Sequence, residues 1–142
     1  MFKDILLPVD LSDAAGQEKA VNAAVELARS FGSRIHVMTI VPTFGEGFVS
    51  SFFPADYQDK AMAAAREHLH AFTRERIPDG LPVQHVVACG TIYEEILDFA
   101  KRHPVDLIVM ASHRPELSDY LLGPNAARVT RHAGCSVMVV RA

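Results

Sequence analysis

The sequence predicts an α/β fold in which a doubly wound, five-stranded parallel sheet of strand order 3-2-1-4-5 is covered by four helices. Apolar runs such as residues 5–9 and 107–111 show no polar alternation, so both faces of these strands should be covered, as in a parallel sheet. Such runs alternate along the chain with segments whose apolar residues recur at helical spacing. Right-handed crossovers between parallel strands then place helices on both faces of the sheet.

The composition is that of one globular domain covering residues 1–142, since 49% of the residues are hydrophobic and 22% are charged. The net charge of −3 argues against a nucleic-acid partner. No apolar run approaches the ~20 residues of a membrane span, and the first residues read as a strand rather than a signal peptide. Cys89 and Cys135 form no disulfide framework or metal motif and are expected to be small buried hydrophobes, so we expect a cytoplasmic protein.

Five strands are expected, each bounded by turn or helix signals. They cover residues 5–9, 35–41, 83–88, 105–111 and 136–141. The connection at residues 43–55 contains two glycines, a proline and four phenylalanines, and a loop of this length in a compact domain is often functional. Its phenylalanines are predicted to cover a ligand cleft, to pack on another subunit or to pack locally.

Four helices are expected, and each has a start or stop signal. Three of the starts are marked by side chains that can cap a helix, which are Ser12, Asp56 and the capping-box pair Thr91 and Glu94. The fourth helix is expected to cover residues 125–132. The stops are marked by Gly32, Pro78 and Gly134. The residues expected on the inner faces are Val21, Ala24, Val25 and Ala28, then Ala61, Ala65, Leu69 and Phe72, then Ile92, Ile96 and Phe99, and finally Ala126 and Val129.

A ligand site is expected where the first and fourth strands end. In such a sheet, ligands bind outside the carboxyl ends of the strands, at the point where the winding direction reverses. Asp10, at the tip of the first strand, is predicted to bond ribose hydroxyls or a metal-bound phosphate, or else to be a turn or capping aspartate. Ile40, at the end of the second strand, would offer backbone groups and an apolar wall to a flat base, or else belong to the core.

The fourth strand leads into a candidate anion site. Its end, Ala111-Ser112-His113-Arg114, is followed by Gly123-Pro124-Asn125 at the start of the last helix. A strand, a loop and a Gly-led turn into a helix is how an α/β sheet binds phosphate, because the first amides of a helix have no partner within it. Arg114 carries a fork of donors that suits phosphate oxygens, although it could also face solvent or a partner chain.

Three segments together resemble the universal stress protein family. They are Ile-Leu-Leu-Pro-Val-Asp at 5–10, Gly90-Thr91-Ile92, and the stretch from Met110 to Arg141. The resemblance covers the whole chain. It implies a single domain with the five-stranded arrangement above, in a family where many members bind ATP or a related nucleotide and others do not. It also implies a homodimer through the edge strand at residues 136–141, or a tetramer built from such dimers.

The nucleotide loop departs from that family's pattern of Gly, two residues, Gly, nine residues and Gly-Ser or Gly-Thr. Its glycines map onto Ala111, Arg114 and Gly123, and Pro124 replaces the hydroxyl residue, with one residue fewer in the spacing. The loop is similar to a variant subgroup with Ser-His-Arg-Pro and Leu-Leu-Gly-x-Asn, some of whose members hold nucleotide. Losing one amide and one hydroxyl would weaken phosphate binding by about a hundredfold, which other donors would partly recover.

We therefore expect a stress-response protein that binds ATP or AMP, with or without Mg²⁺, and that is not a dedicated enzyme. The alternatives are an interaction protein of the same fold that binds no nucleotide, and a slow ATPase. The predicted binding residues are Pro8, Val9, Asp10, Ile40, Met110, Ala111, Ser112, His113, Arg114, Gly123, Pro124 and Asn125. No metal site is expected, since the histidines are scattered and His68 and His70 point to different sides of a helix. Arg128, Arg131 and His132 are interpreted as a solvated basic face.

Overall fold

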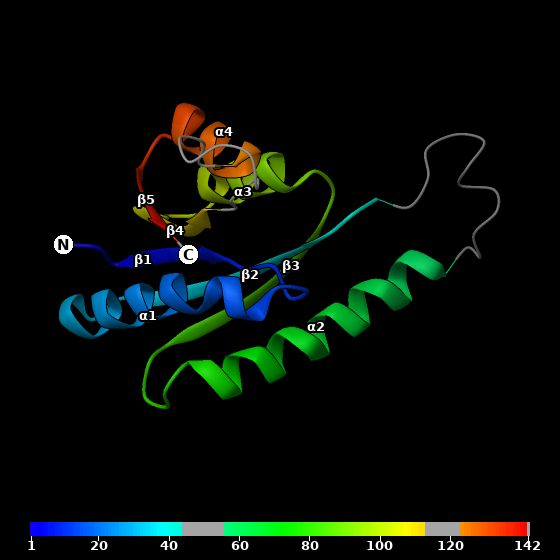
Figure 1. Ribbon diagram of the computed structural model, residues 1–142, viewed down its shortest axis with the longest axis horizontal. Helices are drawn as coiled ribbons and strands as arrows, with labels where there is room; N and C mark the ends of the chain where they lie inside the picture. Colours follow the sequence, from blue (N-terminus) through cyan, green and yellow to red (C-terminus); the bar gives the residue numbers. More distant parts are fainter. Residues whose placement is uncertain (44–55, 113–122, 142) are drawn as a thin grey trace.

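The five strands form one parallel sheet of order β3-β2-β1-β4-β5 (Figure 1), as the sequence predicts. The computed structural model describes residues 1–43, 56–112 and 123–141. The strands are β1 (Asp4–Pro8), β2 (Arg34–Val41), β3 (Val83–Cys89), β4 (Leu107–Ser112) and β5 (Ser136–Arg141). Their ends differ from the expected ranges by at most two residues, and β5 matches its expected range at both ends. The chain enters the sheet at its centre, and β3 and β5 are the two edges.

Four helices connect the strands, two on each face of the sheet. They are α1 (Ala14–Phe31), α2 (Tyr57–Arg76), α3 (Ile92–Arg102) and α4 (Pro124–His132). Figure 1 shows α1 and α2 on one side of the strands and α3 and α4 on the other. In the described part of the chain, no helix is long and apolar enough to cross a membrane. The predicted connection at residues 43–55, with its phenylalanines, lies outside the described residues from position 44 onward.

The core consists of two apolar layers separated by the sheet. One layer joins α1 and α2 to alternate residues of the strands, including Ile5, Leu7 and Leu69. The other joins α3 and α4 to the opposite strand face, including Leu6 and Ile108. All five of these side chains are fully buried. The continuous apolar run in β1 is explained by this arrangement, because successive side chains serve different layers.

The predicted helix caps are only partly correct. Gly32 ends α1 in the left-handed conformation, as expected. Ser12 does not cap α1; Asp13 does, accepting a hydrogen bond from the Gly16 amide at 3.1 Å. The prediction was wrong because two adjacent residues can both cap this helix. The Ser12 hydroxyl instead donates a hydrogen bond to the Asp10 carboxylate at 2.6 Å.

Three further predictions at helix ends need correction. Thr91 and Asp56 occupy cap positions, but neither side chain makes a capping hydrogen bond. Asp56 instead pairs with Lys60 one turn further on, at 2.9 Å, where the lysine competes for the carboxylate. The last helix ends at His132 and is followed by Ala133 in an extended conformation, so Gly134 does not act as a left-handed cap of α4.

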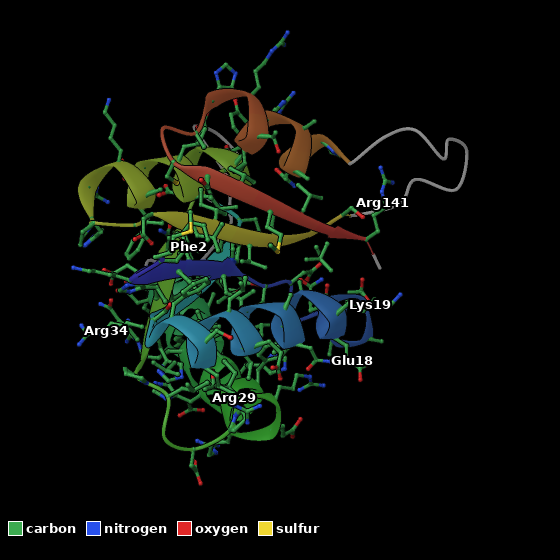
Figure 2. All side chains as sticks on the ribbon, turned by 90° about the vertical axis from the view of Figure 1, so that its left-hand side faces the viewer. Phe2, Glu18, Lys19, Arg29, Arg34 and Arg141 are labelled. Atoms are coloured by element: carbon green, nitrogen blue, oxygen red, sulfur yellow. The ribbon has the colours of Figure 1, made fainter. Side chains whose placement is uncertain are left out.

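The inner faces of α2 and α3 are shorter than predicted. Leu69 and Phe72 are buried, whereas Ala61 and Ala65 are only half-buried because the first turns of α2 extend away from the sheet (Figure 1). In α3, Ile96 and Phe99 are buried but Ile92 is 44% exposed. Glu18 and Lys19 of α1 point outward into solvent (Figure 2), so the polar face of this helix lies opposite its buried stripe.

Candidate functional site

A cavity of about 680 Å³ opens at the carboxyl end of the sheet, beside the starts of α1, α3 and α4. This volume is within the range typical of small-molecule sites. Its position next to β1 and β4 is the topological switch point of the fold, where the first crossovers run in opposite directions. The lining residues are Pro8, Val9, Asp10, Asp13, Gly16, Gln17, Thr39, Ile40, Pro42, Gly90, Ile92, Ile96, Met110, Ala111, Ser112, Gly123, Pro124, Asn125 and Ala126.

Ten of the twelve predicted binding residues line this one cavity. They are Pro8, Val9, Asp10, Ile40, Met110, Ala111, Ser112, Gly123, Pro124 and Asn125. The other two, His113 and Arg114, lie outside the described residues. Four separate segments of the sequence therefore converge on one site, and binding by these residues is still a prediction.

Asp10 is held by a local turn at the mouth of the cavity. Its Oδ1 atom accepts hydrogen bonds from the Ser12 amide at 3.0 Å and the Ser12 hydroxyl at 2.6 Å. The backbone carbonyl of Asp10 accepts from the Asp13 amide at 3.1 Å. The turn role that the sequence left open is thus present. It fixes the carboxylate at the edge of the cavity, where it can also accept hydrogen bonds from a ligand.

The start of α1 adds residues that sequence reasoning missed. Asp13, Gly16 and Gln17 all line the cavity. A Cβ atom at Gly16 would lie 2.2 Å from an Asp13 carboxylate oxygen, so glycine is what allows the cap to form there. Gln17 is only 8% exposed on the single chain. The signal that could have found them is the glycine three residues after a capping aspartate.

The start of α4 lines the cavity, and its first amides have no hydrogen-bond partner within the helix. Gly123 has φ 88° and ψ 156°, a conformation that residues with a Cβ rarely adopt, and no described side chain caps the helix. Ala127 is the first residue to bond within the helix, to the Gly123 carbonyl at 3.0 Å. The amides of Asn125 and Ala126 thus have no helical partner, while Pro124 contributes no amide.

Ser112 lines the cavity at the end of β4, and its hydroxyl is buried. The residue is 3% exposed, and its Oγ atom has no hydrogen-bond partner among the described residues. Thr39, at the end of β2, is another buried polar residue of the lining, at 6% exposed.

Several residues of the lining are apolar. Ile40 is half-buried and lies on the cavity, so it is not a plain core residue. The other apolar residues of the lining include Pro42, Met110, Ala111 and the largely exposed Ile92. Sequence reasoning assigned Ile92 to the inner stripe of α3, because periodicity alone does not separate a core face from a cavity wall.

The described lining carries negative charge. Asp10 and Asp13 contribute two carboxylates, and the described lining residues include no lysine, arginine or histidine. Across residues 1–43, 56–112 and 123–141, no group of three or more histidine, cysteine, aspartate or glutamate side chains could hold a metal ion. A Mg²⁺ ion here would rely on phosphate oxygens and on these two carboxylates.

The histidines, cysteines and basic residues outside the cavity have structural surroundings. His70 of α2 stacks on His85 of β3 with ring centroids 3.7 Å apart, while His68 is exposed. Both cysteines are half-buried rather than fully buried, and burial raises the pKa of the Cys135 thiol. Arg128 lies over the Tyr93 ring at 4.7 Å, so the basic face of α4 is not purely solvated.

The fold and this cavity define a doubly wound α/β protein with a small-molecule cleft at its switch point. The model of the universal stress protein family matches residues 1–141. Universal stress protein G of Escherichia coli O157:H7 is 32% identical over 145 residues, covering 99% of this chain and 100% of that protein. The chain belongs to the universal stress protein family.

Solved structures share the fold. The hypothetical protein MJ0577 superimposes with a TM-score of 0.80 at 24% identity, covering 100% of this chain and 97% of that chain. A universal stress protein in complex with cAMP gives a TM-score of 0.69 at 17% identity, covering 98% and 97%. The universal stress protein from Archaeoglobus fulgidus in complex with dAMP gives 0.58 at 19% identity, covering 97% of both chains. Identities this low show the common fold alone.

Proposed function

We propose that the cavity at the carboxyl end of the sheet binds an adenine nucleotide, and that the protein acts in a cellular stress response through this binding. The observation that carries the proposal is the convergence of four sequence segments on one cavity that is lined by both apolar and polar residues. The cAMP and dAMP complexes of structural neighbours support the adenine class.

The division of the lining suits the parts of such a ligand. The base would lie against the apolar surface around Ile40 and Ile92. The ribose hydroxyls would donate to the Asp10 carboxylate, whose position the Ser12 bonds fix. The phosphate would lie at the start of α4, where the amides of Asn125 and Ala126 have no partner within the helix and the helix dipole favours an anion.

Retained ligand and direct titration test this proposal. The purified protein is denatured and the supernatant is separated by chromatography, and the native protein is titrated with adenosine, AMP and ATP in a calorimeter. Released adenine nucleotide, or heat on titration with AMP, supports the proposal. An empty supernatant together with no heat at millimolar ligand would contradict it and favour the interaction protein of the same fold.

No catalytic role is proposed, because the described lining offers carboxylates but no established base next to a phosphate. A slow ATPase is the remaining enzymatic alternative. Release of phosphate from ATP above background, with the same rate in samples from independent purifications, would favour that alternative.

We also propose a cytoplasmic homodimer of single-domain chains, paired through β5. This strand is an edge of the sheet, its Val137, Val139 and Val140 are half-buried, and Met138 is 37% exposed on the single chain. An apolar edge strand tends to pair with another chain. Sedimentation at micromolar concentration should give twice the chain mass, and a single-chain mass would contradict this pairing.

A further inference from the structure

We propose that the side-chain amide of Gln17 hydrogen bonds the sugar of the bound nucleotide, and that Gln17 and Asp10 together select ligands whose sugar carries hydroxyl groups. The inference rests on the proposed function, since it assumes an adenine nucleotide in this cavity. It goes further by naming a residue that determines specificity and the part of the ligand that this residue contacts.

Gln17 is a polar residue at an inward position of α1. It lies four residues before Val21, seven before Ala24 and eleven before Ala28, which are all buried on the face of α1 that packs on the sheet. Gln17 itself is only 8% exposed, and it lines the cavity. The buried stripe of α1 therefore continues to the cavity, and the stripe position that lines the cavity is polar.

The amide of Gln17 is available to a ligand. No described residue forms a hydrogen bond with this amide. Its two polar atoms retain accessible surface, unlike the Oγ atom of Ser112, which is unpaired but cut off from solvent. Polar side chains that are more than nine-tenths buried normally have a partner within the protein. An accessible, unpaired amide in such a residue on a cavity wall therefore indicates a ligand contact.

The fold holds Gln17 close to Asp10. The Asp13 amide donates to the Asp10 carbonyl at 3.1 Å, and Oδ1 of Asp13 accepts from the Gly16 amide at 3.1 Å. Gln17 follows Gly16 in the first turn of α1. A hydrogen-bonded turn and the start of one helix thus connect the Asp10 carboxylate to the Gln17 amide, and both residues line the same cavity.

The two faces of the sheet decide which part of the ligand Gln17 can reach. Val9 and Ala111, at the ends of β1 and β4, line the cavity and pack in the same layer as α1. Ile40 and the start of α4 pack in the opposite layer, so the proposed positions of the base and the phosphate lie on the other face of the sheet. The sugar, which lies beside Asp10 between base and phosphate, is the part that Gln17 can contact.

Asp10 and Gln17 offer complementary groups to a sugar hydroxyl. A hydroxyl donates one hydrogen bond and accepts others, whereas the Asp10 carboxylate can only accept. The Gln17 amide supplies two N–H donors and one acceptor oxygen, without adding charge. A hydroxyl that donates to Asp10 can therefore accept from Gln17. A sugar without hydroxyls would leave both side chains unpaired, which lowers the affinity for such a ligand.

The test compares two ligands on two matched variants of the full chain. Wild type, Gln17→Met and Asn22→Leu are titrated with AMP and with dideoxy-AMP, which lacks both sugar hydroxyls. Binding is followed by the amide chemical shifts of the isotope-labelled protein, so that weak complexes are also measured. Methionine is as long and unbranched as glutamine but has no amide. Asn22 is the control because its amide is at an exposed position of α1 outside the cavity lining.

Wild type should bind AMP at least about tenfold more tightly than dideoxy-AMP. Gln17→Met should weaken AMP binding by about threefold to tenfold and leave dideoxy-AMP binding unchanged. Asn22→Leu should change neither affinity. The ligand-free Gln17→Met protein should unfold at the same or a higher temperature, because it no longer buries an unpaired amide.

Three results would overturn the inference while leaving the proposed function intact. The first is a wild type that binds AMP and dideoxy-AMP equally well. The second is a Gln17→Met variant that binds AMP as tightly as wild type does. The third is an equal loss of affinity for both ligands in Gln17→Met, which would place the amide away from the sugar hydroxyls. Failure of the proposed function looks different, because wild type would then show no saturable shifts with either ligand.

Discussion

The two ends of the parallel sheet treat their buried polar groups differently. At the amino end, several polar groups are paired within the protein: the half-buried Asp106 accepts from the amides of Lys3 at 2.9 Å and Asp4 at 3.1 Å. His36, 5% exposed, contacts Asp4 at 2.9 Å and also Gln84, and the Ser33 hydroxyl donates to the Phe2 carbonyl. These contacts join the chain start, β2 and β3 into one network.

At the carboxyl end, the buried polar residues face the cavity instead. Of the five buried polar residues in the described ranges, Ser33 and His36 belong to the amino-end network, whereas Gln17, Thr39 and Ser112 all line the cavity. The comparison teaches that pairing within the protein marks the end of the sheet that stabilises the fold. Buried polar residues that line a cavity mark the end that is available for function.

The largest expected effect comes from breaking the amino-end network with His36→Ala. The variant leaves Asp4 and Gln84 without their shared partner and opens space in the core, so the free energy of unfolding should fall by about 3 kcal/mol. AMP affinity should stay the same, because the network lies at the opposite end of the sheet.

Urea denaturation measures the His36→Ala effect, and His68→Ala, on an exposed position of α2, is the matched control. Equal unfolding free energies for the two variants would contradict a stabilising role for the network.

The second effect comes from the cavity end, with Asp10→Ala. Removing the Asp10 carboxylate should weaken the binding of adenosine and of AMP alike by about tenfold to a hundredfold, since the ribose is common to both ligands. Stability should change by less than about 1 kcal/mol, because Asp10 is exposed and its partners are confined to a local turn.

Calorimetry on Asp10→Ala and on Asp79→Ala, an exposed turn carboxylate outside the lining, separates binding from net charge. A loss of affinity in both variants would show that only the overall charge matters.

The third effect is a gain, expected from Pro124→Ser. Serine restores an amide and adds a hydroxyl at the first turn of α4, so AMP should bind up to about tenfold more tightly. Adenosine affinity should not change. Pro104→Ser, in the exposed turn before β4, controls for the loss of a proline. An equal gain for adenosine and AMP would place the phosphate away from α4.

The smallest expected effect is a pH dependence of the free energy of unfolding, which arises at His85, away from both ends of the sheet. Burial, then the charges of His70 and Arg74, lower the pKa of His85 from 6.5 in the folded protein. A lowered pKa means that the fold favours the neutral ring. The stability that His85 contributes is therefore complete above the pKa of this ring in the unfolded chain. It is lost as the pH falls through the pKa of the ring in the folded protein.

The urea midpoint should accordingly drop between about pH 7.5 and about pH 5, and drop less in His85→Gln. Equal pH dependence in His85→Gln and wild type would remove His85 as the cause. AMP affinity should not follow this titration, since neither His85 nor His70 lines the cavity.

The fold could be predicted because its signals are local and strong. The unbroken apolar run of β1 and the helical spacing of α1 each predict their element, and right-handed crossovers leave few ways to connect them. The cap of α1 could not be predicted in the same way, since Ser12 and Asp13 are adjacent and both can cap. Their choice depends on Asp10, which recruits the Ser12 hydroxyl.

The candidate site was predictable where it lies at strand ends and at the Gly-led start of the last helix. Asp10, Ile40 and Ala111 follow from the rule that ligands bind at the carboxyl ends of parallel strands. Gln17 and Ile92 were missed because each lies on a helix whose periodicity gives it an inward position. Only the three-dimensional structure shows that these inward positions face a cavity rather than the core.

The most direct test of the contrast between the two ends is to map AMP binding by amide chemical shifts on the isotope-labelled full chain. The account predicts large, saturable shifts at Asp10, Ile40, Gly123 and Asn125, and none at His36 and Asp106. Shifts centred on the amino end, or no shifts at any of these residues at millimolar AMP, would contradict it.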